Sequence, residues 1–576
     1  MIRPAGERPR AFPLWRRGLA AGRFAPLDRD LETDVVILGA GITGLTTAYR
    51  LKKAGLRVAV LDPHPIATGA TGHSSAHLTA MPDRSLRSLV SSHGEDVVEG
   101  ALRAGQEAVD LIADTAAELG RPELVVRVPG FSVSETTEGA AGLLEDAELA
   151  RKFGLEAAFT RDVPLPYAVS GALRLEEQGR LEPALYIEAL AEAVDGDNGR
   201  VFVGTRAEEV QDGEPCRVSA PPFTVTAKAV VEATHTPPNL DLAIQTRLGP
   251  YTTYILALRL DAEPPDALIW DDADPYHYLR RAGDLLILGG EDHKTGQESD
   301  PEARFAALLD WARAQLPVAG IERRWSHEVF EPADGLPYIG RDPGRERVYL
   351  AAGFAGNGLT YGTIAGVIIS DLLQGRDSAW AEIFSPKRVK PLASAREVLR
   401  ENLNFAWHLI ADRLHREEKV DGRPPLAPGE GRVMDVDGRK AALYRDPEGH
   451  LHVMSAVCRH AGCVVRWNTT AKTWDCPCHG GRYLPDGRVL CAPPTKGLRR
   501  APNPEPGDRN PEPEARTEVR PPDSGGPGSV KKKPRAGNPP TRGHNHGVYG
   551  ESSATQPCQA ASSSSTSCTL PSLSST

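Results

Sequence analysis

Two short stretches in the C-terminal third of the chain each combine a cysteine with a histidine. Cys458 and His460 form the first pair, and Cys476 and His479 form the second after fifteen intervening residues. This set of donors suits a zinc ion, or a [2Fe–2S] cluster with histidines on one iron. Zinc sites usually pair Cys with Cys and His with His, so two mixed pairs favour the cluster. Imidazole in place of thiolate raises the reduction potential, so the sequence predicts a one-electron carrier.

The two stretches resemble the cluster-binding loops of Rieske proteins, and the likeness extends over residues 428–497. Each stretch also holds a second cysteine, a pattern found in the cytochrome-complex branch of that family. The resemblance implies iron ligands Cys458, His460, Cys476 and His479, and a disulfide between Cys463 and Cys478 that joins the loops.

One position departs from that branch, which carries Ser and Tyr just after the second loop, both donating hydrogen bonds to sulfur. Gly481 stands at the Ser position here, while Tyr483 is kept. Such hydrogen bonds stabilise the more negative, reduced cluster. We therefore expect a reduction potential below that of respiratory Rieske proteins.

A glycine-rich turn near the N-terminus follows the apolar run 34–39, which predicts a buried strand. A helical pattern comes next, and then a second predicted strand, 57–62, that ends in Asp62. This is the context of a dinucleotide-binding fingerprint, in which the pyrophosphate lies at a helix N-terminus and the acid binds a ribose hydroxyl. The fingerprint alone does not separate NAD from FAD. Its residues are Gly39, Ala40, Gly41, Ile42, Thr43 and Gly44.

Residues 34–390 resemble the FAD-dependent D-amino-acid oxidase superfamily. Besides the fingerprint, the likeness rests on the small-residue loop 68–77 and on two glycine-rich stretches, 334–340 and 353–362. The resemblance implies FAD, with the second stretch leading into a helix whose positive end faces the flavin. Further cofactor-binding residues implied in this way are Thr71, His73, Gly353, Gly356, Gly358 and Thr360.

The composition of the chain argues against some functional classes of protein. The net charge of −10 argues against nucleic-acid binding, and no apolar run is long enough for a transmembrane segment. Arg16 and Arg17 invite an export-signal interpretation, but Arg23 interrupts the apolar stretch that follows. We therefore expect a cytoplasmic protein.

The predicted fold is α/β: a Rossmann-like FAD-binding domain with a β-rich substrate subdomain, followed by a small all-β domain and a disordered tail. Apolar positions at helical spacing in 396–414 predict a bridging helix, or a core helix of the flavin domain. The predicted division is an N-terminal arm 1–33, a flavoprotein domain 34–390, a bridge and linker 391–427, the cluster domain 428–497 and the tail 498–576.

These parts predict an FAD-dependent oxidoreductase that takes two electrons from a small amine or amino-acid-like substrate. The electrons would pass singly to the cluster and leave through His460 or His479, at an exposed edge, to an acceptor that the sequence does not identify. No catalytic residue emerges, although Glu291, Asp292 and Trp325 could face the flavin. His73 and His77 lie four residues apart as metal ligands often do, but their place in the flavin loop favours a structural role; a histidyl flavin link through His73 stays open.

Two alternatives remain: an oxygen-using amine oxidase in which the cluster is a side path or sensor, and a non-catalytic electron-transfer module. A Rieske oxygenase would need a mononuclear iron site of two histidines and a carboxylate, and no convincing set appears. An NAD(P)H-dependent reductase would need a second nucleotide fingerprint, which is also missing.

Overall fold

The computed structural model describes residues 13–16, 22–238, 242–388, 404, 407–408, 417–419 and 424–501. All of them belong to one compact unit, Met1–Val519. Most of the predicted bridging helix 396–414 and nearly all of the tail 498–576 lie outside the described residues.

The first sheet has eight strands, in the order β16-β17-β10-β1-β2-β7, with β9 paired to β10 and β8 paired to β9. The five strands from β17 to β7 run parallel, and β16 is an antiparallel edge strand. Burial on both faces explains the continuous apolar runs of β1 and β2. The strands are β1 Leu31–Leu38, β2 Val58–Asp62, β7 Gly199–Val203, β8 Glu209–Gln211, β9 Cys216–Ala220, β10 Phe223–Glu232, β16 Tyr338–Arg341 and β17 Val348–Ala352.

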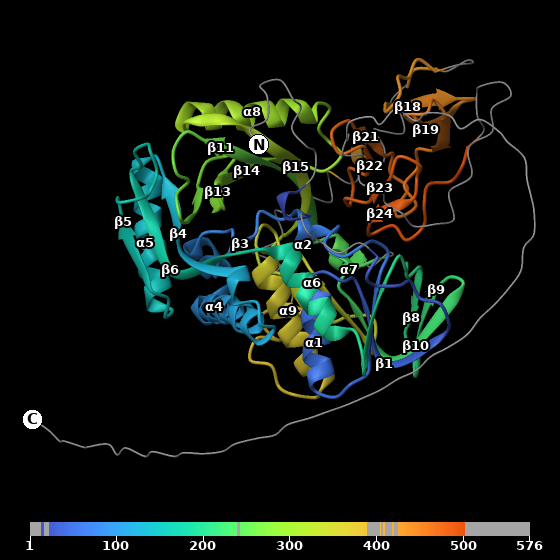
Figure 1. The fold of residues 1–576 in the computed structure, drawn as a ribbon, viewed down its shortest axis with the longest axis horizontal. Coiled ribbons are helices and arrows are strands. Elements are labelled where there is room, and N and C mark those ends of the chain that lie inside the picture. Colours follow the sequence, from blue (N-terminus) through green and yellow to red (C-terminus); the bar gives the residue numbers. More distant parts are fainter. Residues whose placement is uncertain are drawn as a thin grey trace, which may run out of the picture. The chain divides into compact units, whose positions relative to one another are not determined.

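Three helices, α1 (Ile42–Lys53), α6 (Pro183–Val194) and α9 (Gly358–Leu373), pack together beside this sheet (Figure 1). Helix α1 contacts both of the others. Its first residue lies close to the second turn of α9, because a Cβ at Gly362 would lie 2.6 Å from Cγ2 of Ile42. The two helix N-termini therefore meet at one place.

The second sheet has nine strands in the order β15-β11-β14-β13-β12-β4-β6-β3, with β5 beside β6. Neighbours are antiparallel except for β12 and β4. This is the β-rich subdomain that the sequence predicts. The strands are β3 His77–Leu78, β4 Val125–Ser134, β5 Ala157–Thr160, β6 Gly171–Leu181, β11 Leu248–Leu260, β12 Leu268–Asp271, β13 His277–Ala282, β14 Leu285–Lys294 and β15 Val318–Pro332.

Six further helices accompany the two sheets in the described part of the chain, and we call residues 22–388 the two-sheet domain. Helix α4 packs against α9, and α8 lies against β11 and β14. The helices are α2 Ala70–His73, α3 Leu86–His93, α4 Glu95–Glu118, α5 Thr137–Lys152, α7 Leu242–Gln245 and α8 Pro301–Gln315.

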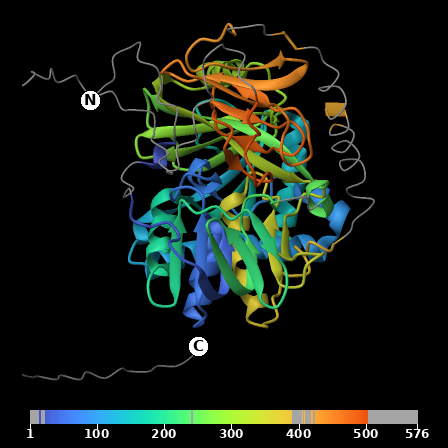
Figure 2. The same cartoon turned by 90° about the vertical axis from the view of Figure 1, so that its right-hand side faces the viewer.

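Residues 424–501 form a C-terminal β-domain of two small sheets, orange to red in Figure 2. Three strands within residues 431–455 form the first sheet, and four strands within residues 466–491 form the second. The predicted fold class, α/β followed by a small all-β domain, is confirmed. The strands are β18 Gly431–Val436, β19 Arg439–Arg445, β20 Leu451–Ser455, β21 Arg466–Asn468, β22 Thr473–Asp475, β23 Arg482–Tyr483 and β24 Val489–Cys491. Within the described residues, no helix has the length and apolar character needed to cross a bilayer.

Candidate cofactor sites

The turn between β1 and α1 is built on glycines that leave no room for a side chain. Gly39 has φ +107°, and a Cβ there would lie 2.4 Å from the Ala233 carbonyl oxygen. A Cβ at Gly44 would lie 1.9 Å from the Gly39 carbonyl oxygen. The backbone N–H of Ile42, at the start of α1, donates to Thr71 Oγ1 at 3.1 Å. The turn thus presents a helix N-terminus, the feature that binds a pyrophosphate.

A cavity of about 620 Å³ opens in front of this turn. It extends from the end of β2 to the glycine-rich loop before α9 and to β13 and β15. The volume falls within the range of small-molecule and cofactor sites. The sequence-predicted residues that line it are Gly39, Gly41, Ile42, Thr43, Asp62, Thr71, Gly353, Gly356 and Gly358.

Four other sequence-predicted residues do not line this cavity. Ala40 uses its N–H to donate to Asp62 Oδ2 at 2.8 Å, and Gly44 packs under the turn. His73 pairs its Nδ1 with the Gly69 carbonyl at 3.0 Å, and a flavin link through His73 stays a prediction. Thr360 is buried and donates to the Thr79 carbonyl at 2.8 Å.

The contacts correct one further sequence expectation and agree with another. Trp325 is 4% exposed and donates its Nε1–H to the His73 carbonyl, so it belongs to the core rather than to the cavity. Both ring nitrogens of His77 lie within hydrogen-bonding distance of protein oxygens, Ser75 Oγ at 3.0 Å and the Leu279 carbonyl at 3.2 Å. These contacts fit the structural role that the sequence favours for His73 and His77 over a metal pair.

Carboxyl groups gather at the end of the cavity near β13 and β15. Asp83 and Glu331 line it, and Asp292 accepts a hydrogen bond at 3.1 Å from Tyr276, which also lines it. Burial raises the pKa of Asp83 to about 6. Burial also raises the pKa of Asp292 and of Glu331 to about 7 each, and the carboxyls reinforce one another. Sequence analysis named Asp292 but missed the other two, which no local motif marks.

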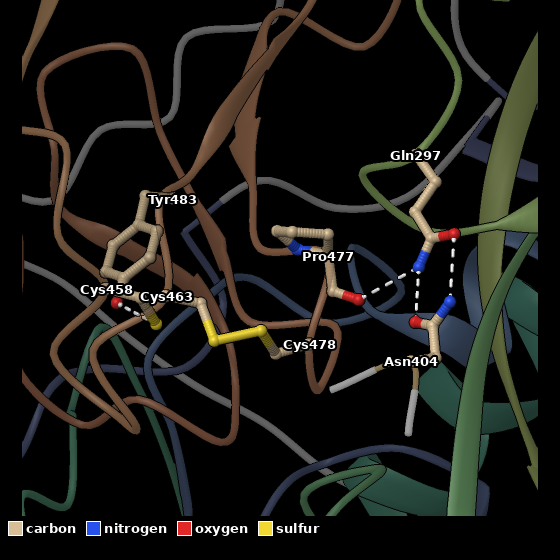
Figure 3. Close-up of a disulfide and its surroundings, with 7 residues drawn as sticks. All are labelled: Gln297, Asn404, Cys458, Cys463, Pro477, Cys478 and Tyr483. Atoms are coloured by element: carbon tan, nitrogen blue, oxygen red, sulfur yellow. Dashed lines mark hydrogen bonds between the residues drawn. A yellow bond between two sulfur atoms is a disulfide. The ribbon is translucent and has the colours of Figure 1, made fainter. Parts of the chain in front are cut away.

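The four predicted iron ligands lie on two loops of the C-terminal β-domain, between β20 and β23. The loops are joined by a disulfide between Cys463 and Cys478, which Figure 3 shows. Tyr483 Oη lies 3.1 Å from the Cys458 sulfur, and it also accepts the N–H of Arg459 at 2.9 Å. A hydrogen bond from the Cys476 thiol, assisted by the one from Tyr483, lowers the pKa of Cys458 to about 7.

The two predicted histidine ligands also meet. The rings of His460 and His479 are 4.9 Å apart between centroids. Burial, followed by the nearby His460, lowers the pKa of His479 to about 3, so this ring is neutral, as a metal ligand must be. Nε2 of His460 lies 2.8 Å from Oε1 of Gln245, which belongs to α7 in the two-sheet domain.

The histidines are not at an exposed edge. His479 is 8% exposed, and His460 is half-buried against Gln245. The expectation that electrons leave through an exposed histidine edge is wrong for His479, because the C-terminal β-domain docks on the two-sheet domain with this side inward. Gln297 of the two-sheet domain also contacts the C-terminal β-domain, because it donates to the Pro477 carbonyl at 3.3 Å (Figure 3).

Strand β15 lies between the cavity and the cluster loops. On one face it presents His327, Val329 and Glu331 to the cavity. On the other face are Glu328 and Phe330: a Cβ at Gly480 would lie 2.6 Å from Oε1 of Glu328 and 3.1 Å from Cζ of Phe330. Alternate residues of a strand point to opposite faces, so a single strand separates the two sites.

The residues present fit both implied cofactors. For FAD, the turn before α1 leaves space for a pyrophosphate, and Asp62 stands where a ribose hydroxyl is bound. For the cluster, the disulfide removes Cys463 and Cys478 from the set of donors, although their sulfurs lie within 4.8 Å of the Cys476 sulfur. Two thiols and two imidazoles remain, which is the set that a mixed-ligand [2Fe–2S] cluster requires.

Comparisons with known proteins agree with this geometry. Residues 34–372 match the family of FAD dependent oxidoreductases, and residues 419–502 match the Rieske [2Fe-2S] domain. The Rieske 2Fe-2S iron-sulfur protein YhfW of Bacillus subtilis is 30% identical over 86% of this chain and 98% of its own length. γ-Glutamylputrescine oxidoreductase of Escherichia coli is 25% identical over 69% of this chain and 97% of its own. The crystal structure of glycine oxidase from Geobacillus kaustophilus shares the fold, with a TM-score of 0.54 at 20% identity over 62% of this chain and 99% of that one.

Proposed function

Because the chain belongs to the FAD-dependent oxidoreductase family and carries a Rieske [2Fe–2S] domain, we propose that it oxidises a small amine or amino-acid-like substrate and passes the electrons through the cluster to a separate acceptor. The flavin supplies hydride acceptance, and the cluster supplies one-electron transfer. Cluster ligands in this proposal are Cys458, His460, Cys476 and His479, and the FAD site is the cavity lined by the fingerprint glycines, Asp62, Thr71 and Gly353–Gly358.

The position of β15 carries this proposal. Glu331 and His327 face the cavity, and the neighbouring residues Glu328 and Phe330 face the cluster loop at Gly480. The His235 ring bridges the two faces, at 5.9 Å from the His327 ring and 4.8 Å from the Phe330 ring. A cluster that served only as a distant sensor would not need its ligand loop packed against the wall of the flavin cavity.

The carboxyl groups at the far end of the cavity support an amine as the substrate. Asp83, Asp292 and Glu331 attract a cation once they are ionised, and pKa values of about 6 to 7 place that ionisation near neutral pH. An amine must lose its proton before its C–H bond transfers hydride. A carboxylate with a pKa near 7 is suited to accept that proton, and Asp292 is held in place by Tyr276.

An anaerobic titration with amines and amino acids tests the proposal. Oxidation of an amine to an imine releases two electrons. We expect bleaching of the flavin absorbance, followed by the low-temperature electron paramagnetic resonance (EPR) signal of the reduced cluster. Bleaching without any cluster signal would contradict electron transfer through the cluster and would favour an amine oxidase in which the cluster is a side path. Absence of bleaching with every amine and amino acid would refute catalysis on this class.

A further inference from the structure

The wall of the FAD cavity is completed by the C-terminal β-domain. Besides residues of the two-sheet domain, the lining includes Leu490, Cys491, Ala492, Pro494 and Thr495. This stretch begins in β24 and continues into the loop that follows it. It lies outside residues 34–372, which match the FAD-dependent oxidoreductase family.

Backbone carbonyls of the same stretch hold two side chains at the ribose end of the cavity. His64 Nε2 lies 3.0 Å from the Leu490 carbonyl, and Arg206 Nη2 donates to the Val489 carbonyl at 2.7 Å. Both side chains line the cavity, and the His64 N–H donates to Asp62 Oδ1 at 2.8 Å. Asp62, the acid expected to bind a ribose hydroxyl, is thus connected to β24 through His64.

The other side of this stretch packs against the cluster loop. A Cβ at Gly481 would lie 2.7 Å from Cδ of Pro494 and 3.7 Å from the Cys458 sulfur. Strand β24 also pairs with β23, with Cys491 opposite Arg482. A single stretch of about seven residues therefore contacts the candidate sites of both cofactors.

We propose that residues 489–495 of the Rieske domain are part of the FAD-binding site, and that they close it at the ribose end. Val489 and Leu490 act as positioning residues, because their carbonyls fix Arg206 and His64. Cys491 and Ala492 are part of the wall itself. FAD retention is then a property of both domains rather than of the two-sheet domain alone. The inference rests on FAD as the occupant of the cavity and is independent of the substrate and the electron acceptor.

Full-length protein that retains its cluster but has been stripped of FAD provides the test, with FAD affinity measured by the quenching of flavin fluorescence. Ala492→Trp places bulk into the wall of the cavity, and we expect at least a tenfold weaker affinity. Lys496→Trp is the matched control, since Lys496 directly follows this stretch, is exposed and does not line the cavity; the FAD affinity of this variant should stay within twofold of wild type. The EPR signal of the reduced cluster shows whether the C-terminal β-domain is intact in each variant.

Wild-type affinity in Ala492→Trp with an intact cluster signal would overturn the proposal, and so would an equal loss in Lys496→Trp. If Ala492→Trp loses its cluster signal, the test passes to Cys491→Ala. This change only shortens a side chain of a lining residue and adds no bulk to the C-terminal β-domain. Faster release of FAD from Cys491→Ala, by about threefold or more, supports the proposal, and a wild-type release rate contradicts it. These readouts concern FAD alone, so they are distinct from a failure to oxidise amines.

Discussion

Replacing Tyr483 by phenylalanine should lower the reduction potential of the cluster. The hydroxyl of Tyr483 lies 3.1 Å from the Cys458 sulfur, in a side chain with no solvent exposure. A hydrogen bond to a charged group contributes about 1.5–3 kcal/mol. We assume that about 1 kcal/mol of this is gained only when the extra electron arrives. Since about 1.4 kcal/mol corresponds to about 59 mV for one electron, the potential should fall by about 40 mV.

A potentiometric titration followed by EPR at fixed pH measures this shift. The matched control is Tyr444→Phe, in the same domain, where the Tyr444 ring packs on Trp467 at 5.3 Å. Loss of a single hydroxyl costs about 1 kcal/mol of stability, so both variants should remain folded. A Tyr483→Phe potential within about 10 mV of wild type, or above it, would show that the hydroxyl does not stabilise the reduced cluster.

Three other changes test the turn before α1, the carboxyl groups at the cavity and a buried ion pair at the end of β10. Gly44→Ala should abolish FAD retention and lower the melting temperature, because its Cβ would lie 1.9 Å from a backbone oxygen and overpacking costs about 1–3 kcal/mol. The affinity for tetramethylammonium, a cation that does not titrate, should rise about fivefold from pH 6 to pH 8 as Asp292 and Glu331 ionise through pKa values of about 7, and Asp292→Asn should weaken this dependence without abolishing it. Arg345→Ala should lower the free energy of unfolding in urea by about 3 kcal/mol, because it removes a two-point ion pair from the buried Glu232, to which Arg345 donates at 2.8 Å and 2.9 Å.

Each of these changes has a matched control. Gly320→Ala adds a Cβ in open space without a positive φ and should keep its FAD. Glu291→Gln should leave the pH dependence of tetramethylammonium affinity in place, since Glu291 is engaged by Arg304. Arg347→Ala removes an exposed ion pair with Glu214 and should cost less than about 1 kcal/mol. Retained FAD in Gly44→Ala, an unchanged pH slope in Asp292→Asn, or equal losses of stability in the two arginine variants would contradict the respective argument.

The parts of the two sites that lie within one turn or loop could be predicted from the sequence. Gly39 and Gly44 follow a strand and precede a helix, and their spacing alone indicates a turn that must approach its neighbours closely. Cys458 and His460 are separated by one residue, so the chemistry of the pair is visible without a fold. In such motifs the geometry is set by a few consecutive dihedral angles.

Residues whose role depends on how distant segments pack could not be predicted in this way. Asp83 and Glu331 are separated by 247 residues, and only the fold brings both to the same cavity. The burial of His479 depends on how the C-terminal β-domain docks on the two-sheet domain, so the loop sequence alone made an exposed edge the natural expectation. Cys491 lines the cavity for the same reason, although no cysteine occurs in the flavin loops themselves.

The arrangement of β15 explains how one short segment serves two redox sites. Side chains alternate between the faces of a strand, so His327, Val329 and Glu331 must share one face, and Glu328 and Phe330 the other. The register that fixes this choice is the pairing with β11, in which Tyr251 lies opposite Val329 and Pro250 opposite Phe330. A shift of one residue would turn Phe330 toward the cavity and Glu331 toward the cluster loop. The same pairing therefore determines both the chemistry of the flavin chamber and the contact with the cluster loop, and neither can be altered independently of the other.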